Sequence, residues 1–297
     1  MRTLSTVLRD QYGEKIYKLS LSSGCTCPNR DGTVGFGGCA FCSEGGSGEF
    51  ASTAKEIEVQ IEEAKERIRK KVSAERFIAY FQSFTNTFGD VGRLTKLYEM
   101  VILRDDIVIL SIGTRPDCLD DNVMEMLQYL NQIKPVWVEL GLQTMHDETA
   151  ARMNRGYPLV VFEEALRKLK CAGIQVIVHV IFGLPGESKD DMLQTIRYLA
   201  ELDPVPDGVK LQMLNILKGT LLARQYEEKR FPLLSMEEYT DLVAKSIRIF
   251  PEDMILHRMT GDGPGNLLIA PDWVRNKKKV LNTIHRKMAM DHRSSNI

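Results

Sequence analysis

Short apolar segments alternate with amphipathic ones along most of the chain. Runs rich in β-branched and aromatic residues predict seven strands, at residues 15–22, 76–81, 106–112, 135–140, 174–182, 208–214 and 253–258. Between them, apolar residues recur every three or four positions and predict helices at about 53–72, 91–104, 119–132, 158–171, 188–201 and 235–249. Nearly continuous apolar strands separated by amphipathic helices are typical of parallel βαβ units.

Six or seven such units in one chain predict an α/β fold in which parallel strands carry outer helices, as a barrel or an open part-barrel. A doubly wound open sheet is the alternative. No Ser/Gly-rich linker or low-complexity tract divides residues 1–297. We therefore expect a single domain, ending in a basic helical extension at about 271–297.

Composition narrows the class of protein. Lys and Arg number 39 and Asp and Glu number 40, so no overall field attracts nucleic acid or membranes, and such binding needs a local patch. The N-terminus lacks the apolar stretch of a signal peptide, and the longest apolar run, 176–184, is too short to span a bilayer. We expect a cytoplasmic protein with no membrane partner. Thiols stay reduced in the cytoplasm, which favours metal or redox chemistry over disulfides for clustered cysteines.

Four of the six cysteines lie in the glycine-rich segment CTCPNRDGTVGFGGCAFC, residues 25–42. Four thiolates could form a tetrahedral zinc site, with Cys39 and Cys42 as a C-x2-C knuckle, although the C-x-C half is unusual. An iron–sulfur cluster needs three thiolates and leaves one iron open to a ligand. Spacing alone favours the cluster and leaves zinc as the alternative. The other two cysteines, Cys118 and Cys171, are expected to be small core residues.

Polar or glycine-rich motifs follow the ends of all seven predicted strands. Each one alone is compatible with simple turn chemistry. The carboxyl ends of parallel strands meet at one edge, however, so seven such motifs predict one large site there. The motifs are the cysteine segment within 25–48, QSFTNT (82–87), GTRPD (113–117), GLQT (141–144), GLPGE (183–187), NILKGT (215–220) and MTGDGP (259–264).

The segment CPNRDGTVGFGGCAFC, followed in order by YFQSFTNT, TRPDCL, ELGLQT, NRGY, IFGLPGE, LKGT and HRMTGDGP, resembles the radical S-adenosylmethionine (SAM) superfamily. It resembles in particular the YhcC/YtqA-like branch, in which eleven residues separate the first two cluster cysteines, and CSEGGSGEFA is similar to the YtqA side. The resemblance covers nearly the whole chain. It implies a partial (βα)6-type barrel with a cluster loop at 25–48.

The same resemblance implies two cofactors. A [4Fe–4S] cluster would be held by Cys27, Cys39 and Cys42, with Cys25 as a bystander. In the superfamily the open iron binds the amino and carboxylate groups of SAM, and one electron cleaves SAM to a 5′-deoxyadenosyl radical. A flavodoxin- or ferredoxin-type protein is the expected electron donor.

Several SAM contacts are implied by the resemblance. Phe41 would lie beside the adenine, and Gln143 and Arg155 match residues that contact the ribose or a carboxylate. His179 stands where relatives have an acidic ribose ligand, and an inward-facing core histidine is an equal alternative. Glu139, at a strand end among apolar neighbours, is expected to be a polar site residue.

The segment after the second strand departs from the superfamily. Relatives have a GGE-like stretch there, which holds the methionyl amine of SAM. This chain has Gln82, Ser83 and Thr85 around that position, so neutral oxygens are expected to take over. Gly113 likewise replaces a glutamate of the relatives.

Three classes of function stay open. The resemblance extends to the radical-SAM half of elongator-type wobble-uridine enzymes, and the YtqA branch is associated with converting 5-carboxymethylaminomethyl-uridine to 5-aminomethyl-uridine, so tRNA is the expected partner. A small-molecule or protein substrate for the same chemistry is the second class, and a non-enzymatic zinc-binding module the third.

The C-terminal segment gives local support to tRNA. Its cations could contact phosphates, or they could lie on a solvated final helix that packs Val274, Leu281 and Ile284 on the barrel. They are Lys277, Lys278, Lys279, Arg286 and Lys287.

Overall fold

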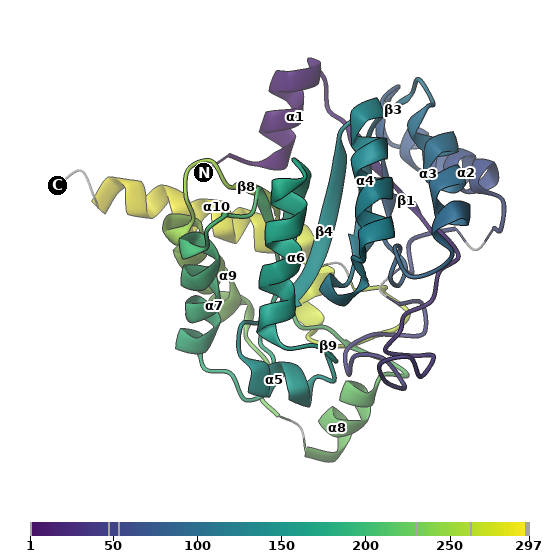
Figure 1. Ribbon diagram of the computed structural model, residues 1–297. Coiled ribbons are helices and arrows are strands. Elements are labelled where there is room, and N and C mark those ends of the chain that lie inside the picture. Colours follow the sequence, from purple (N-terminus) through teal and green to yellow (C-terminus); the bar gives the residue numbers. More distant parts are fainter. Residues whose placement is uncertain (1, 47, 53, 230, 262, 295–297) are drawn as a thin grey trace.

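The chain forms a curled, fully parallel sheet with helices around its outer side (Figure 1). The computed structural model describes residues 2–46, 48–52, 54–229, 231–261 and 263–294. The seven strands lie in the order β1-β2-β3-β4-β5-β6-β8. They are β1 Tyr17–Leu21, β2 Phe77–Phe81, β3 Ile107–Thr114, β4 Val136–Gln143, β5 Gln175–Phe182, β6 Gly208–Met213 and β8 Ile255–Arg258. A small antiparallel pair, β7 Ile216–Leu217 and β9 Leu268–Ala270, lies beside them.

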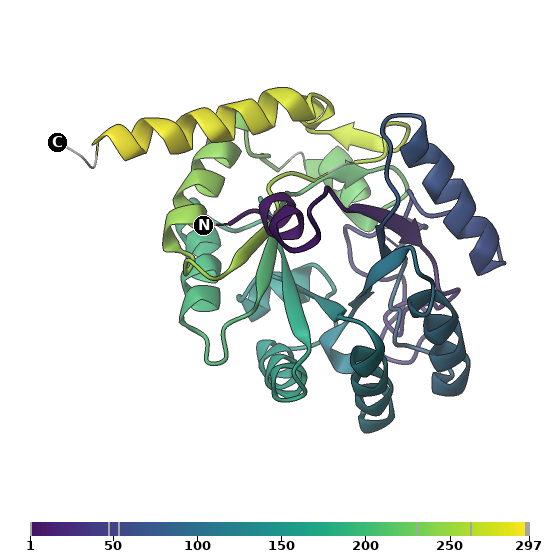
Figure 2. The same ribbon diagram turned by 90° about the horizontal axis from the view of Figure 1, so that it is seen from above.

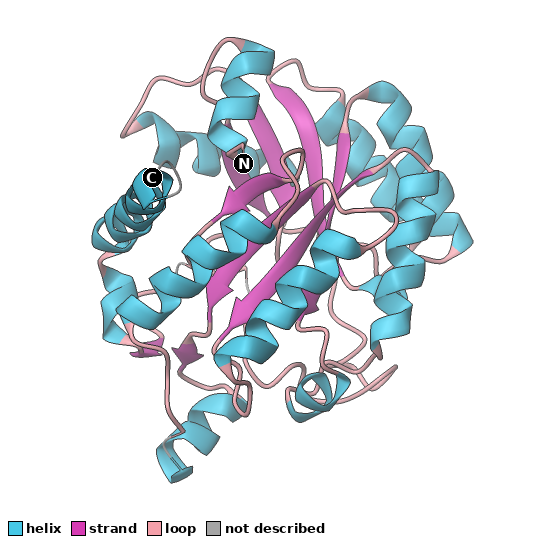
Figure 3. Ribbon diagram, turned by 90° about the vertical axis from the view of Figure 1, so that its left-hand side faces the viewer, coloured by secondary structure: helices cyan, strands magenta, loops and turns pink. Residues whose placement is uncertain are grey.

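Helices follow the strands along the chain and cover the outer face of the sheet (Figures 2 and 3). The α-helices are α1 Leu4–Tyr12, α2 Ile57–Arg69, α3 Val91–Ile102, α4 Asp121–Ile133, α5 Asp147–Arg152, α6 Leu159–Cys171, α7 Lys189–Glu201, α8 Leu221–Lys229, α9 Met236–Ile249 and α10 Lys277–Ser294. Short 3-10 turns occupy Pro116–Cys118 and Asp272–Arg275. Helices α7 and α9 each begin with a capping box, which fixes where the preceding strand-end loop stops.

Side chains alternate between the two faces of the sheet, so each strand contributes to an outer core under the helices and to the interior of the curled sheet. In β4, Val136, Val138 and Leu140 pack in the main core cluster with the outer helices, whereas Trp137 belongs to a second cluster inside the curl. Because strand side chains point to alternate faces, Glu139 also faces the interior.

Helix α1 closes the amino-terminal end of the curled sheet. Its Leu8 packs with Ile78, Ile109, Trp137 and Ile177, one residue from each of four neighbouring strands. Figure 2 shows α1 lying inside the arc of strands. The opposite, carboxyl-terminal end is the one left for a site.

The predicted architecture is confirmed. All seven expected strands and all six expected helices are present, with ends shifted by a few residues. A doubly wound sheet is wrong, because the strands follow one another in order and the helices lie on one face. Strands β1 to β6 with their helices make the expected partial barrel, and β8 adds a seventh strand.

Two lone cysteines and three short helices differ from the sequence-based predictions. Cys171 is exposed at the end of α6 and Cys118 is half-buried, so neither is the core residue expected. Helices α1, α5 and α8 were not predicted, since each has nine residues or fewer and too few turns to show a helical period. No helix in the described part of the chain combines the length and apolar character needed to cross a membrane.

Candidate active site

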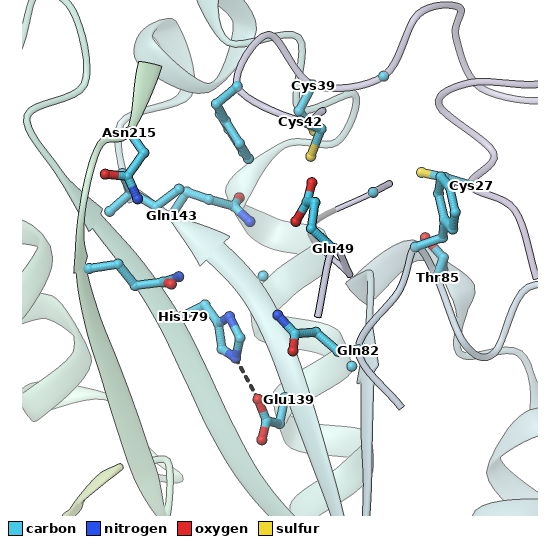
Figure 4. Close-up of a pocket in the computed structure, with 18 of the residues that line it drawn as sticks. Cys27, Cys39, Cys42, Glu49, Gln82, Thr85, Glu139, Gln143, His179 and Asn215 are labelled. Atoms are coloured by element: carbon cyan, nitrogen blue, oxygen red, sulfur yellow. Dashed lines mark hydrogen bonds and ion pairs between the residues drawn. The ribbon is translucent and has the colours of Figure 1, made fainter. Parts of the chain in front are cut away.

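A cavity of about 230 Å³ opens at the carboxyl ends of the strands. Loops that follow six of the seven strands contribute to its wall, as their strand-end motifs predict. The seventh motif, GLPGE (183–187) after β5, contributes no lining residue, so its place in the site was predicted wrongly. Of the residues expected to bind cofactors, nine line it (Figure 4). They are Cys27, Cys39, Cys42, Phe41, Gln82, Thr85, Glu139, Gln143 and His179.

The cysteine loop, residues 25–50, forms one wall of this pocket. Gly37 and Gly38 have φ of 78° and 79°, values that favour glycine and turn the chain back toward Cys39. The Cys42 amide donates to the Cys39 carbonyl at 2.9 Å, which places both thiols in one tight turn. The loop is fastened to the segment before α6, where the Ala40 amide donates to the Met153 carbonyl at 2.9 Å.

Cys25 differs from the other three cysteines of the loop. It is buried, packs in the main core, and its Sγ accepts a hydrogen bond from Arg93 Nη2 at 3.3 Å. Cys27, Cys39 and Cys42 line the pocket instead. The structure thus separates one core thiol from three pocket thiols.

The three pocket thiols have the donor chemistry that an iron–sulfur cluster needs. A hydrogen bond with Cys42, then burial, raises the pKa of Cys39 well above its usual value, and the Cys27 and Cys42 thiolates add to the shift. Within the described residues no three His, Cys, Asp or Glu side chains converge on a point fit for one metal ion. The ligands of a cluster bind separate iron atoms, and three thiols facing an open cavity fit that arrangement, because iron displaces their protons on binding.

The floor of the pocket is a buried polar network, here called the floor network: Lys18, Tyr80, Ser111, Glu139, His179 and Lys210. Glu139 is 2% exposed and lies at its centre. Its Oε1 accepts from Lys18 Nζ at 2.8 Å and from Ser111 Oγ at 2.9 Å. Its Oε2 accepts from His179 Nε2 at 2.7 Å and from Lys210 Nζ.

The charges of this network define the protonation of His179. Burial by itself would raise the pKa of Glu139, but the charges of Lys18 and Lys210 outweigh it and hold this pKa well below its usual value. Burial, together with Lys210, lowers the pKa of His179 to about 4. A neutral imidazole beside an ionised carboxylate carries its proton on Nε2. The Nδ1 lone pair is thereby left as an acceptor for a ligand in the pocket.

The rim carries backbone strain and an unused acceptor. Gln143 has a φ of 64°, in the region that favours glycine, and its buried Oε1 has no partner among the described residues. Phe84, also on the rim, has a φ of 61°. Such conformations cost about 1–3 kcal/mol each and concentrate at functional sites.

Ser83 and Arg155 do not line the pocket as described. Arg155 is 1% exposed. Its guanidinium donates to the carbonyls of Leu142, Thr144 and Tyr157 at 2.8–3.0 Å and to Asp147 at 2.9 Å. All three of its nitrogens thus hold the end of β4 against the segment before α6. Contact of Arg155 with SAM stays a prediction, and this arrangement lends it no support.

Other pocket residues were missed from sequence. Glu49, Arg115, Tyr157, Asn215 and Arg258 all line the cavity. Four of them belong to motifs that had been assigned to the site without individual roles, GTRPD, NRGY, NILKGT and HRMTGDGP. Glu49 follows Cys42 by seven residues and belongs to CSEGGSGEFA, a segment that carried the family resemblance without a role for its acids.

Family models match two stretches of the chain: the Radical SAM superfamily over residues 24–199 and the Radical_SAM C-terminal domain over 206–290. The seven-stranded sheet runs through both, since β6 and β8 of the second stretch continue the order of the first. YtqA of Bacillus subtilis is 44% identical over 96% of this chain and 88% of its own length. YhcC of Escherichia coli is 38% identical over 91% and 86%.

More distant similarity extends to elongator proteins. Elongator complex protein 3 of Danio rerio is 29% identical over 52% of this chain and 28% of its own length. The structure of Elp3 from the archaeon Methanocaldococcus infernus shares the fold, with a TM-score of 0.66 at 19% identity, over 77% of this chain and 58% of that one. The chain belongs to the radical SAM superfamily, in its YhcC/YtqA-like branch, and is an enzyme of the class whose cofactors are a [4Fe–4S] cluster and S-adenosylmethionine.

Proposed function

We propose that this enzyme modifies a wobble uridine of tRNA, converting 5-carboxymethylaminomethyl-uridine to 5-aminomethyl-uridine. The observation that supports it is the strand-end motif set, which resembles that of elongator-type wobble-uridine enzymes and six of whose seven members contribute to one pocket. The sequence similarity to Elongator complex protein 3 and the shared fold with archaeal Elp3 are consistent with this reading.

The proposed reaction balances without a further oxidant. The bond between the amine nitrogen and the carboxymethyl carbon breaks, one water enters, and the two-carbon fragment leaves as glyoxylate. The two electrons that the amine loses would pass to SAM, whose products would be methionine and 5′-deoxyadenosine. When bound, the cluster and SAM supply the radical that removes one hydrogen atom from the carboxymethyl carbon.

The residues of the chain supply binding and shielding. Cys27, Cys39 and Cys42 would hold the cluster at one wall, while the neutral His179 presents an acceptor from the floor. The fully paired Glu139 keeps that imidazole in a single tautomer. Such a fixed, partly apolar cavity limits the access of water to a reactive intermediate.

The final helix α10 provides a candidate tRNA surface. Lys277, Lys278 and Lys279 are exposed at its start, while Val280 and Ile284 of the same helix, like Val274 in the turn before it, are buried. The helix therefore has both a packed face and a cationic face. Lys287 is different, because it pairs with Glu237 at 2.7 Å and with Asp241 on α9.

The test is a reaction of the reconstituted enzyme with SAM, a reductant and tRNA that carries 5-carboxymethylaminomethyl-uridine. We expect 5-aminomethyl-uridine and one glyoxylate per nucleoside converted, measured by mass spectrometry of digested tRNA. Unchanged tRNA together with SAM cleavage on other compounds would instead assign a small-molecule or protein substrate.

A second measurement tests the docking surface. Changing Lys277, Lys278 and Lys279 to Gln should weaken tRNA binding and reduce the log–log salt slope by roughly 0.7–0.9 for each phosphate that a lysine no longer neutralises. SAM cleavage without tRNA should not change. An unaltered salt slope would remove α10 from the proposed interface.

A further inference from the structure

Glu49 brings into the pocket a carboxylate oxygen that has no partner in the described part of the chain. It belongs to the cysteine loop, lines the cavity, and Figure 4 shows its carboxylate directed into it. Its Oε1 is buried and has no hydrogen-bond partner among the described residues. A buried carboxylate oxygen without a donor is costly, so the arrangement indicates that a bound ligand completes it.

The second carboxylate of the described pocket wall is already neutralised. Glu139 accepts from Lys18, Lys210, His179 and Ser111, which leaves it no free lone pair aimed at a ligand. Among the described lining residues, Glu49 is therefore the acid available to a cationic group.

The neighbouring arginines are engaged elsewhere. Arg30 donates to the carbonyls of Cys42 and Ser43 and lies over the Phe84 ring, 5.4 Å from its centroid. Arg115 forms a bidentate pair with Asp117 at 2.7 and 2.9 Å. Arg258, the third arginine of the pocket wall, donates to Gln212 Oε1 at 3.5 Å. We therefore assign the positive partner of Glu49 to the ligand.

Packing places Glu49 beside the segment that follows β2. The Phe84 amide donates to the Gly46 carbonyl at 3.0 Å. Gly48 lies so close to Ser83 that a Cβ on it would overlap the serine side chain. Gly46 and Gly48 thus lie against Phe84 and Ser83, in the segment where this chain lacks the acidic residue of its relatives.

We propose that Glu49 binds the α-ammonium group of SAM. The carboxylate comes from the cysteine loop and not from the segment after β2, yet it reaches the same part of the pocket. Two features favour the ammonium group of SAM over an ammonium group of a substrate. The loop that carries Glu49 also carries the three pocket thiols. Glu49 Oε1 also lies close to Gly45, three residues after Cys42, at 3.3 Å from the position that a Cβ on Gly45 would take. The neutral oxygens of Gln82 and Thr85 then take a secondary part. The proposal needs only the two cofactors of the superfamily and is independent of the tRNA substrate.

The test measures SAM binding to the cluster-containing protein under anaerobic conditions without reductant, so that no turnover occurs. Glu49→Gln keeps the shape of the side chain and removes its charge, and should weaken SAM binding about 10- to 100-fold, the value of one charge-assisted hydrogen bond. A SAM analogue with a hydrogen in place of the α-amino group has no donor for Glu49 and should bind both proteins equally. Glu44→Gln, at an exposed position of the same loop, is the matched control and should leave SAM affinity unchanged.

Iron content and circular dichroism of each variant separate a binding effect from loss of the cluster or fold. Unchanged SAM affinity in the Glu49→Gln protein overturns the proposal. Equal weakening for SAM and its desamino analogue also overturns it, because the carboxylate would then act on the sulfonium or on the loop itself. Weaker binding of modified tRNA with intact SAM affinity would reassign Glu49 to a substrate amine and likewise overturn it.

Discussion

The cysteine loop and the floor network differ in whether their buried polar atoms have hydrogen-bond partners. In the floor network, both oxygens of Glu139 are satisfied by four donors that come from strands β1, β3, β5 and β6. In the cysteine loop, Asn29 Oδ1, Ser43 Oγ and Glu49 Oε1 are buried without a partner among the described residues. Glu139 of the floor network is thus fully hydrogen-bonded within the protein, whereas the cysteine loop keeps buried acceptors that a ligand could use.

This difference follows from what holds each region. Strand register fixes the floor side chains at the same time as the sheet forms, so their charges can be paired within the protein. The cysteine loop has few buried apolar residues of its own, and it depends on turns and on contacts with residues 82–85 and 153–156. We infer that bound cofactors supply the missing hydrogen-bond partners of the cysteine loop, whereas the floor network is already ordered before the cofactors bind.

The largest effect is expected in the cysteine loop. Replacing Cys27, Cys39 or Cys42 by Ala should abolish cluster binding, because each removes one of three thiolate ligands. Iron content and sulfur-to-iron charge-transfer absorbance measure the loss. Cys25→Ala should keep the cluster, since that thiol packs in the core. A cluster that survives in the Cys39→Ala protein, or disappears in the Cys25→Ala protein, would contradict the assignment.

The floor should respond through stability. Glu139→Ala leaves the cations Lys18 and Lys210 without their carboxylate and should lower the free energy of unfolding by about 3–5 kcal/mol. Glu49→Ala removes an unpartnered acid and should leave the free energy of unfolding of the cofactor-free protein within about 1 kcal/mol of its original value. Denaturant titrations of both proteins compare the two regions directly. Equal losses would show that the loop is as fully paired as the floor.

A pH dependence is expected from His179. Its pKa is about 4 in the folded protein against an ordinary value of 6.5, so the unfolded chain takes up the proton first as pH falls. Stability is therefore lost between about pH 6.5 and pH 4, with a slope of up to about 1.4 kcal/mol per pH unit from this group. His179→Gln should flatten the profile by that amount. His285→Gln, at an exposed position on α10, should leave it as it is.

The smallest effect concerns the strained rim. Gln143→Gly relieves a left-handed backbone conformation and should raise the free energy of unfolding by about 1 kcal/mol. The same change removes an amide from the pocket wall and should weaken SAM binding. A less stable protein with unchanged SAM affinity would show that Gln143 serves the fold and not the site.

Periodicity alone was enough for the fold. The apolar strands and amphipathic helices gave the right elements in the right order, because burial on both faces of a strand and on one face of a helix leaves a direct mark on the sequence. The same reasoning brought most strand-end motifs to one pocket, since parallel strands all end at the same edge. Cys27, Cys39 and Cys42 were picked out by their resemblance to a spaced motif, and the structure separates them from Cys25.

The partners of charged side chains were decided only by the tertiary structure. Glu139 meets Lys18 across 121 positions of sequence and Lys210 across 71, a pairing that depends on register and curvature. Arg155 is a second example. Its motif predicted a place in the pocket, but the turn after β4 directs its guanidinium onto three carbonyls and Asp147. The hydrophobic period of the sequence predicts on which face of an element a residue lies. It does not predict which residues of other elements that face contacts.

Glu49 shows the same limit in a loop. Its sequence context is a run of glycines with no period, so nothing local fixes its direction. The packing of Gly46 and Gly48 on Phe84 and Ser83 turns its carboxylate into the cavity. The sequence by itself determined the elements, their order and the cluster-binding motif, because these depend on local pattern and spacing. The pairing and direction of polar side chains were decided in three dimensions, because they depend on contacts between segments distant in the chain.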